Sequence, residues 1–194
     1  ATAESDRKIH LRDASTFEEV FRIEDDPNGF VSLAFSPDGS ILATGGGNPP
    51  EIVQRPPGKS PPTESRPIPL RLWNAKTGAP LRSLNGHVGS IYATAFSPDG
   101  TRLISAGADG RIRVWDVGRE MLVHELTSGQ KAILSVAVSP DGKILATSSA
   151  DGLIQIWDLA EGKLLRTLSK QTNWVFGLAF HPDGTRLASA GGDQ

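Results

Sequence analysis

A histidine, a serine and an aspartate in one stretch of the chain could together perform hydrolysis: His87, Ser105 and Asp109. In a serine hydrolase, a histidine oriented by an aspartate takes the proton from the attacking serine. The serine must also stand in an exposed pocket beside an oxyanion hole. The sequence indicates neither feature, so we expect a structural role for these side chains and no catalytic residue.

Residues that could bind a metal ion or a phosphate group are no better supported. The remaining histidines, none of which forms a pair with metal-ligand spacing, are His10, His124 and His181. Aspartates recur in Pro-Asp-Gly turns, without the further carboxylates that a calcium site requires, at Asp38, Asp99, Asp141 and Asp183. Glycines 45–47 run into prolines rather than into a helix, which argues against a phosphate-binding loop. We therefore expect neither a bound metal nor a cofactor.

The turns belong to a repeat that runs along the chain. The string Phe-Ser-Pro-Asp-Gly, or a close copy, places its prolines at Pro37, Pro98, Pro140 and Pro182. Tryptophans recur in the same phase, 42 residues apart, at Trp73, Trp115 and Trp157. The first proline interval is 19 residues longer than the others, because residues 46–67 form an insertion rich in proline and polar residues. We expect this insertion to lack regular structure, since it has few residues able to form a core.

Each repeat is predicted to form four short antiparallel strands. In the second full repeat, the strands cover 91–96, 102–106, 111–115 and 121–126. Ser97-Pro98-Asp99-Gly100 joins the first two strands, since proline presets φ and glycine accepts a positive φ. Four strands every ~40–45 residues is the spacing of a propeller blade. Within a single propeller segment, 1–194, full blades are expected at 30–84, 90–126 and 133–168, a half-blade of third and fourth strands at 1–23, and a half-blade of first and second strands at 175–194.

The motifs of these repeats resemble those of the WD-repeat β-propeller family. The resemblance rests on Gly86-His87, the Ser-Pro-Asp-Gly turns, Asp109-Gly110 and Trp115-Asp116, and it covers nearly the whole chain except the insertion. It implies an all-β fold of four-stranded antiparallel blades. It also implies a non-catalytic scaffold for protein–protein interaction, as a module of a larger multidomain protein. The regular repeats and their Phe-Ser-Pro-Asp-Gly motif resemble those of bacterial members of the family.

The resemblance further implies a hydrogen-bonded cluster that bridges the strands of a blade. Its members are His87, Ser105, Asp109 and Trp115. Other repeats keep partial clusters, which comprise Thr147, Asp151 and Trp157 in one repeat and Thr44 and Trp73 in another. Gly129 and Asp26 replace the histidine in these two repeats, and Arg12 replaces the tryptophan of the N-terminal half-blade. Loss of the histidine from other copies supports a structural role over a catalytic one.

Loops at one face of the blades are the expected binding surface for a protein or peptide partner. Strand alternation brings His87, the segment with Trp174 and the insertion at 46–67 to the same face. The candidate binding residues, which occupy repeat positions where the side chain varies, are Trp174, Asn173, Tyr92 and Phe176. Exposed aromatic residues are favoured anchors of interfaces. Trp174 could instead pack against a neighbouring blade, and the prolines of the insertion could be recognised as a polyproline II helix or stay solvated.

The chain ends also fit the repeat, because residues 1–6 resemble residues 188–193. We expect a fragment whose remaining blades come from a longer parent chain. Two alternatives remain open: a four-bladed ring closed by pairing 9–23 with 175–190, and an eight-bladed ring made from two copies.

Composition limits the classes of partner. The chain has 194 residues and a formal net charge of −2, which gives no electrostatic reason to expect a nucleic acid or an anionic membrane. It has no cysteine, and no apolar run approaches the ~18 residues of a membrane span. We expect a cytoplasmic protein. A propeller enzyme with its site outside these residues and a purely structural spacer are the alternative functions, although the predicted inner strands carry no charged residue for catalysis.

Overall fold

The structure, a computed structural model, describes residues 2–3, 8–23, 29–47, 67–129, 131–168 and 173–192. These residues form strands and turns and contain no helix. The all-β fold expected from the repeat pattern is confirmed. Most of the insertion, 48–66, lies outside the described residues, and so does Asp26.

Strands β1 to β17 form five antiparallel sheets in which strands consecutive in the chain are neighbours. The first sheet contains β1 (Thr2–Ala3), β2 (Ile9–Arg12) and β3 (Glu19–Ile23). The second contains β4 (Ser32–Phe35), β5 (Ile41–Gly45), β6 (Leu70–Asn74) and β7 (Pro80–Leu84). The third contains β8 (Ile91–Phe96), β9 (Arg102–Gly107), β10 (Arg111–Asp116) and β11 (Met121–Thr127). The fourth contains β12 (Ile133–Val138), β13 (Ile144–Ser149), β14 (Ile154–Asp158) and β15 (Lys163–Leu168), and the last contains β16 (Val175–Phe180) and β17 (Leu187–Gly191).

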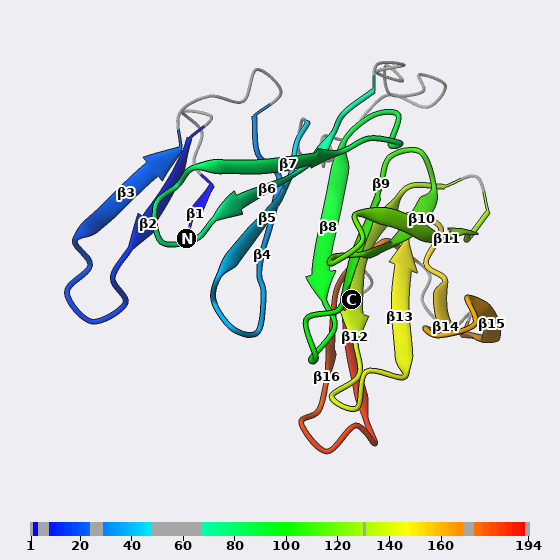
Figure 1. The fold of residues 1–194 in the computed structure, drawn as a ribbon. Helices are drawn as coiled ribbons and strands as arrows, with labels where there is room; N and C mark the ends of the chain where they lie inside the picture. The colour runs from blue at the N-terminus through cyan, green and yellow to red at the C-terminus, as the bar shows by residue number, and fades with distance from the viewer. Residues whose placement is uncertain are drawn as a thin grey trace.

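The sheets are arranged side by side as blades (Figure 1). Their first strands, β4, β8, β12 and β16, contact one another in that order. In Figure 1 these strands lie in the middle of the molecule, with β3 and β15 at opposite outer sides. Among the described residues β17 pairs with β16 alone and β2 pairs with β1 and β3. The self-closed ring of four blades is therefore not the arrangement that the chain adopts here.

The hydrophobic core lies between neighbouring blades rather than inside one sheet. The tryptophans of the repeat, Trp73, Trp115 and Trp157, are each 4% exposed and lie in three separate apolar clusters. Trp115, for example, packs with Leu72 of the preceding blade and Leu103 of its own. The second strand of a blade is buried on both faces: in β9 every residue after Arg102 is buried, and these residues are small or apolar regardless of alternation. Each blade therefore needs its neighbours to remove this apolar surface from water.

The first-to-second turns hold themselves together by hydrogen bonds to the turn aspartate. In one such turn, the Ser97 hydroxyl donates to Asp99 Oδ1 at 2.5 Å and the Thr101 amide donates to the same oxygen at 3.0 Å. The amide of Arg102 in turn donates to Ser97 Oγ at 2.9 Å. In the turn one repeat earlier, the hydroxyls of Ser36 and Ser40 lower the pKa of Asp38 to about 2. These carboxylates are thus turn residues whose oxygens already have partners.

The last of these turns is the one in which the repeat is imperfect. His181 occupies the position that Ser36, Ser97 and Ser139 have in the other turns. Within the described residues, the Arg186 amide does not donate to the His181 side chain, whereas the Arg102 amide donates to Ser97 Oγ. We predict that His181→Ser restores this bond and raises the free energy of unfolding by about 0.5–1 kcal/mol. Urea denaturation measures the change. An unchanged or lower midpoint would show that the serine bond adds nothing to the turn.

Candidate functional site

The loops above β8, β9 and β10 bring together the four side chains that the sequence groups in a cluster. His87 lies in the loop between β7 and β8, and Asp109 lies in the turn between β9 and β10. Ser105 on β9 is paired directly with Arg113 on β10, and Trp115 follows two residues later on the same face. Strand register therefore aligns the serine and the tryptophan beneath the two loop residues.

The cluster is a continuous chain of hydrogen bonds. The Trp115 indole N–H donates to Ser105 Oγ at 2.9 Å. Ser105 Oγ lies 2.8 Å from His87 Nε2, and His87 Nδ1 lies 3.0 Å from Asp109 Oδ2. His87 Nδ1 faces the Asp109 carboxylate and also lies 2.8 Å from Arg113 Nη1. We assign the imidazole proton to Nδ1, toward the carboxylate, so that Arg113 Nη1 donates to Asp109 rather than to the ring and Nε2 accepts from the serine. Every polar atom in this chain of bonds then has a partner.

Asp109 accepts hydrogen bonds from further donors besides His87. Its oxygens accept from the amides of Val88 at 3.2 Å and Arg111 at 3.1 Å, and from Arg113 Nη1 at 2.8 Å. Burial by itself would raise the pKa of this carboxyl. The hydrogen bonds from His87 and Arg113 instead hold its pKa well below the ordinary value. The turn aspartate is therefore an ionised acceptor that ties two loops and a strand together.

Arg113 is a member of this site that sequence reasoning missed. Its side chain is 8% exposed, and its Nη2 lies 2.8 Å from Glu125 Oε2 on β11. The arginine thus links Asp109 to the outermost strand of the blade. A signal was present in the sequence, because strand alternation puts Arg113 on the same face as Trp115, four residues after the aspartate.

The burial of the cluster bears on its chemistry. Ser105 has 0% exposure and His87 has 1%, so a substrate has no access to the serine hydroxyl. The hydroxyl also accepts the indole N–H, which fixes its position. These contacts suit a structural element and do not suit a nucleophile.

The other repeats retain only part of the cluster. The indole N–H of Trp157 donates to Thr147 Oγ1 at 3.0 Å, and that of Trp73 donates to Thr44 Oγ1 at 3.0 Å. Asp151 does not join this pair: it accepts from the Ser149 hydroxyl and from the Leu153 amide. Gly129 at the histidine position has no imidazole to bridge the threonine and the aspartate. The buried Oε1 of Gln155, at the position of Arg113, has no hydrogen-bond partner among the described residues.

The candidate binding residues lie on two separate strands. Trp174 and Phe176 contact each other edge to face at the start of β16, with ring centroids 5.9 Å apart, and Phe176 is 40% exposed. Asn173 accepts from the Trp174 amide at 2.8 Å and donates to the Gly192 carbonyl at 3.2 Å, so it holds the end of the β16–β17 hairpin. Tyr92 is on β8, and β12 lies between β8 and β16. The four residues therefore do not form one patch.

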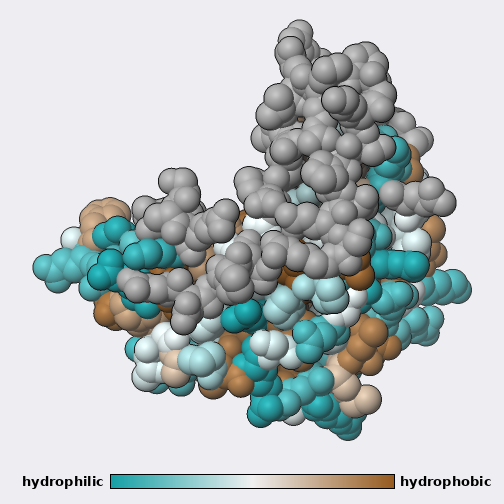
Figure 2. All heavy atoms as spheres, turned by 90° about the horizontal axis from the view of Figure 1, so that it is seen from above, coloured by the Kyte–Doolittle hydropathy of each residue, from teal (hydrophilic) through white to brown (hydrophobic). Residues whose placement is uncertain are grey.

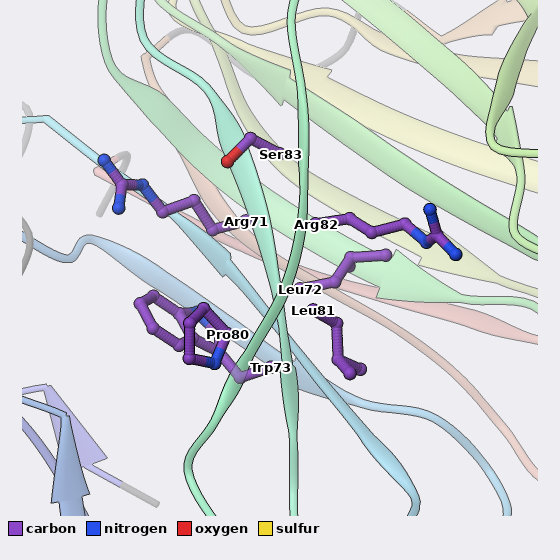
Figure 3. A pocket seen from close by; sticks show the side chains of 7 residues that line it. All are labelled: Arg71, Leu72, Trp73, Pro80, Leu81, Arg82 and Ser83. Carbon is purple, nitrogen blue, oxygen red and sulfur yellow. The ribbon is translucent and has the colours of Figure 1, made fainter.

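Figure 2 shows the loop face from above, and the coloured hydrophilic and hydrophobic residues are interspersed on it. A shallow hollow of about 370 Å³ lies along the β6–β7 hairpin and is lined by Arg71, Leu72, Trp73, Pro80, Leu81, Arg82 and Ser83. Figure 3 shows that Arg71 and Trp73 point to one side of the hairpin and Arg82 to the other. These groups do not converge on a ligand position.

The described residues also hold no group of three metal-ligating side chains and no helix long and apolar enough to cross a membrane.

Comparisons with known proteins agree with the repeat pattern. The family described as "WD domain, G-beta repeat" matches residues 18–48, 78–116, 120–158 and 162–194. WD repeat-containing protein 1 of Bos taurus is 35% identical over 131 residues, which are 66% of this chain and 18% of that protein. WD repeat and SOCS box-containing protein 1 of Xenopus tropicalis is 29% identical over 120 residues, which are 61% of this chain and 24% of that protein. The nuclear distribution protein PAC1 of Arthroderma benhamiae is 30% identical over 118 residues, which are 60% of this chain and 23% of that protein.

The chain thus spans only between 18% and 24% of the length of these three relatives. They come from vertebrates and a fungus, and they give no support to the bacterial resemblance of the repeats.

Proposed function

This chain belongs to the WD-repeat family, and on that basis we propose that it is a non-catalytic scaffold to which other proteins bind. The observation that carries the proposal is the arrangement of the repeats. Apolar clusters hold neighbouring blades together, and the loops that join fourth to first strands and second to third strands share one face. A rigid framework with variable loops suits recognition, because binding then costs little ordering of the backbone.

We place the partner on the face that carries His87, Trp174 and the insertion at 46–67. Two features of the described residues support this choice. The Trp174–Phe176 pair offers aromatic surface next to an ordered hairpin end. Val88, in the loop anchored by the buried cluster, is 45% exposed. The insertion enters this proposal from its sequence alone, because 48–66 lie outside the described residues.

We also propose that further blades, from the parent chain or from a second copy, pack on the blade containing β15. Leu84, the last residue of β7, and Leu126, the last but one of β11, are each 7% exposed. Leu168 at the same repeat position is 39% exposed. Leu126 is covered by the turn at Gly162 in the following blade, where an added Cβ would lie 3.0 Å from the leucine. Third and fourth strands that complete the blade begun by β16 and β17 would cover Leu168 in the same way. A cytoplasmic location remains a prediction, which fractionation of cells that express the tagged full-length protein tests.

Cross-linking of the tagged full-length protein to its partners in cells, followed by mass spectrometry, tests the proposed binding face. We expect partner cross-links at residues of the 85–90 and 173–174 loops, and in the insertion. Lys143, in a turn of the opposite face, serves as the internal reference and should form few. Partner cross-links confined to the opposite turns would contradict the proposed face. Purification of the full-length protein without any saturable partner would favour a structural spacer.

A further inference from the structure

We propose that Asn85, in the loop beside the buried cluster, is a site of spontaneous deamidation in the folded protein. Asn85 follows β7 directly and precedes Gly86, and both residues are exposed. An asparagine followed by glycine favours this reaction, because glycine has no Cβ to hinder the approach of its backbone nitrogen. The folded structure decides whether the two reacting groups are available.

The reaction needs only water as a co-reactant. The backbone nitrogen of Gly86 attacks the Asn85 side-chain carbon Cγ and loses its proton. The bond from Cγ to the carboxamide nitrogen breaks, and that nitrogen leaves as ammonia. Water then opens the resulting five-membered succinimide at one of its two carbonyl carbons. The product is an aspartate at position 85 when the side-chain carbonyl is attacked, and an isoaspartate when the main-chain carbonyl is attacked.

Within the described part of the chain, neither reacting group has a hydrogen-bond partner. The carboxamide of Asn85 makes no hydrogen bond with any described residue. The N–H of Gly86, which is the nucleophile, likewise donates to no acceptor within the described part of the chain. The reaction therefore breaks no hydrogen bond within the described protein when the ring closes.

The other two asparagines with described structure are held in place. Asn74 Oδ1 accepts from the amides of Lys76 at 2.9 Å and Thr77 at 3.1 Å, and the N–H of the following Ala75 donates to Ser40 at 2.9 Å. Asn173 uses both ends of its carboxamide, and its neighbour Trp174 donates its own N–H to that side chain. In both cases the nucleophile is already committed to a hydrogen bond.

Aspartate followed by glycine reacts by the same cyclisation, and the chain is rich in such pairs. In each of the six pairs that the structure describes, the glycine N–H donates to a backbone carbonyl of its own turn. The six glycines, at donor–acceptor distances between 2.8 and 3.1 Å, are Gly39, Gly100, Gly110, Gly142, Gly152 and Gly184. The tight turns of the repeat thus protect these sites, and the longer loop at Asn85 lacks that protection.

The position of Asn85 gives the modification a consequence. His87 lies two residues away, and its imidazole must stay aligned with Asp109 and Ser105. An isoaspartate lengthens the backbone by one atom and would displace the histidine. Either product adds a negative charge to the 85–90 loop, whose Val88 amide donates to the Asp109 carboxylate. If the proposed function holds, this charge also alters the face at which the partner binds.

The test is to incubate the folded full-length protein at neutral pH and follow peptides by mass spectrometry after trypsin digestion. Cleavage after Arg82 and Arg102 gives one peptide that contains both Asn85 and the Asp99-Gly100 turn. We expect the mass of this peptide to rise by one dalton, severalfold faster than for peptides with Asn74 or Asn173. Isomerisation of Asp99 leaves the peptide mass unchanged and is followed by chromatographic separation and fragmentation of the isomers. In the folded protein Asp99 should show no isomerisation, whereas unfolding in urea should start it, because the turn hydrogen bond is lost.

Asn85→Thr is the matched control, because Thr127 occupies the same position in the next repeat. Incubated wild-type protein should melt at a lower temperature than fresh protein, and the Asn85→Thr variant should not change. Deamidation of Asn85 no faster than that of Asn74 and Asn173 would overturn the proposal. So would isomerisation of Asp99 in the folded protein at a rate equal to that of Asn85, since the protective role of the turns would then be wrong.

Discussion

Replacement of Asp109 by alanine should lower the free energy of unfolding by roughly 2–4 kcal/mol, because it leaves several buried donors without an acceptor. The carboxylate accepts from His87, Arg113 and two backbone amides. Its loss also removes one of the two carboxylates that lie 2.8 Å from the guanidinium of Arg113, whose side chain is only 8% exposed. Equilibrium denaturation in urea measures the change.

Asp151→Ala is the matched control for this substitution. Asp151 stands at the same turn position one repeat later, but it is exposed, and among the described residues it bonds only to Ser149 and Leu153. Its removal should cost less than about 1 kcal/mol. Equal costs at the two positions would show that the histidine and the arginine add nothing to the role of Asp109.

The same substitution should change the response to acid. The pKa of Asp109 lies below its ordinary value in the folded protein, so its contribution to stability is fully present above the unfolded pKa of about 3.9. That contribution is lost as the pH falls below this value and the carboxylate is protonated. The stability difference between wild type and Asp109→Ala should therefore be largest near neutral pH and shrink in acid. A difference that stays constant down to the acid-unfolding range would exclude this linkage.

Replacement of Trp115 by alanine should have the larger effect, about 3–5 kcal/mol, because it empties a large volume in a close-packed core. The indole is 4% exposed and packs between two blades with Leu72 and Leu103. Trp115→Phe separates packing from hydrogen bonding, since it keeps a ring but cannot donate to Ser105. Trp115→Phe should lower the free energy of unfolding by less than Trp115→Ala does. A cost for Trp115→Ala below about 1 kcal/mol would contradict a core that lies between blades.

The repeat, its turns and its strands were predictable because they depend on local chemistry. Proline, aspartate and glycine at fixed spacing specify a turn such as 97–100 whatever surrounds it, and the spacing of tryptophans fixes the blade length. The grouping of Ser105 with Trp115 came from the resemblance to WD repeats rather than from the spacing. Local sequence patterns were therefore sufficient to predict the fold class.

Features that depend on three-dimensional neighbours were not predictable in this way. Arg113 reads as an ordinary charged strand residue until His87 and Asp109 are placed above it. Asp151 keeps its place in the sequence motif, yet without an imidazole it turns to Ser149. The reactivity of Asn85 likewise depends on which backbone amides the fold leaves free. In each case a missing or added partner changes the role of a residue whose type is unchanged.

Partner affinity is the measurement that most directly tests the central claim that this chain is an interaction scaffold. The wild-type full-length protein and its Trp174→Ala variant should each be titrated against a purified partner that the cross-linking experiment has identified. The Lys143→Ala variant is the control on the opposite face. The account predicts at least about tenfold weaker binding for Trp174→Ala, a loss of about 1.4 kcal/mol, at unchanged unfolding midpoint. Lys143→Ala should bind as the wild type does. Equal affinity of Trp174→Ala and wild type, together with loss of binding in Lys143→Ala, would contradict the account.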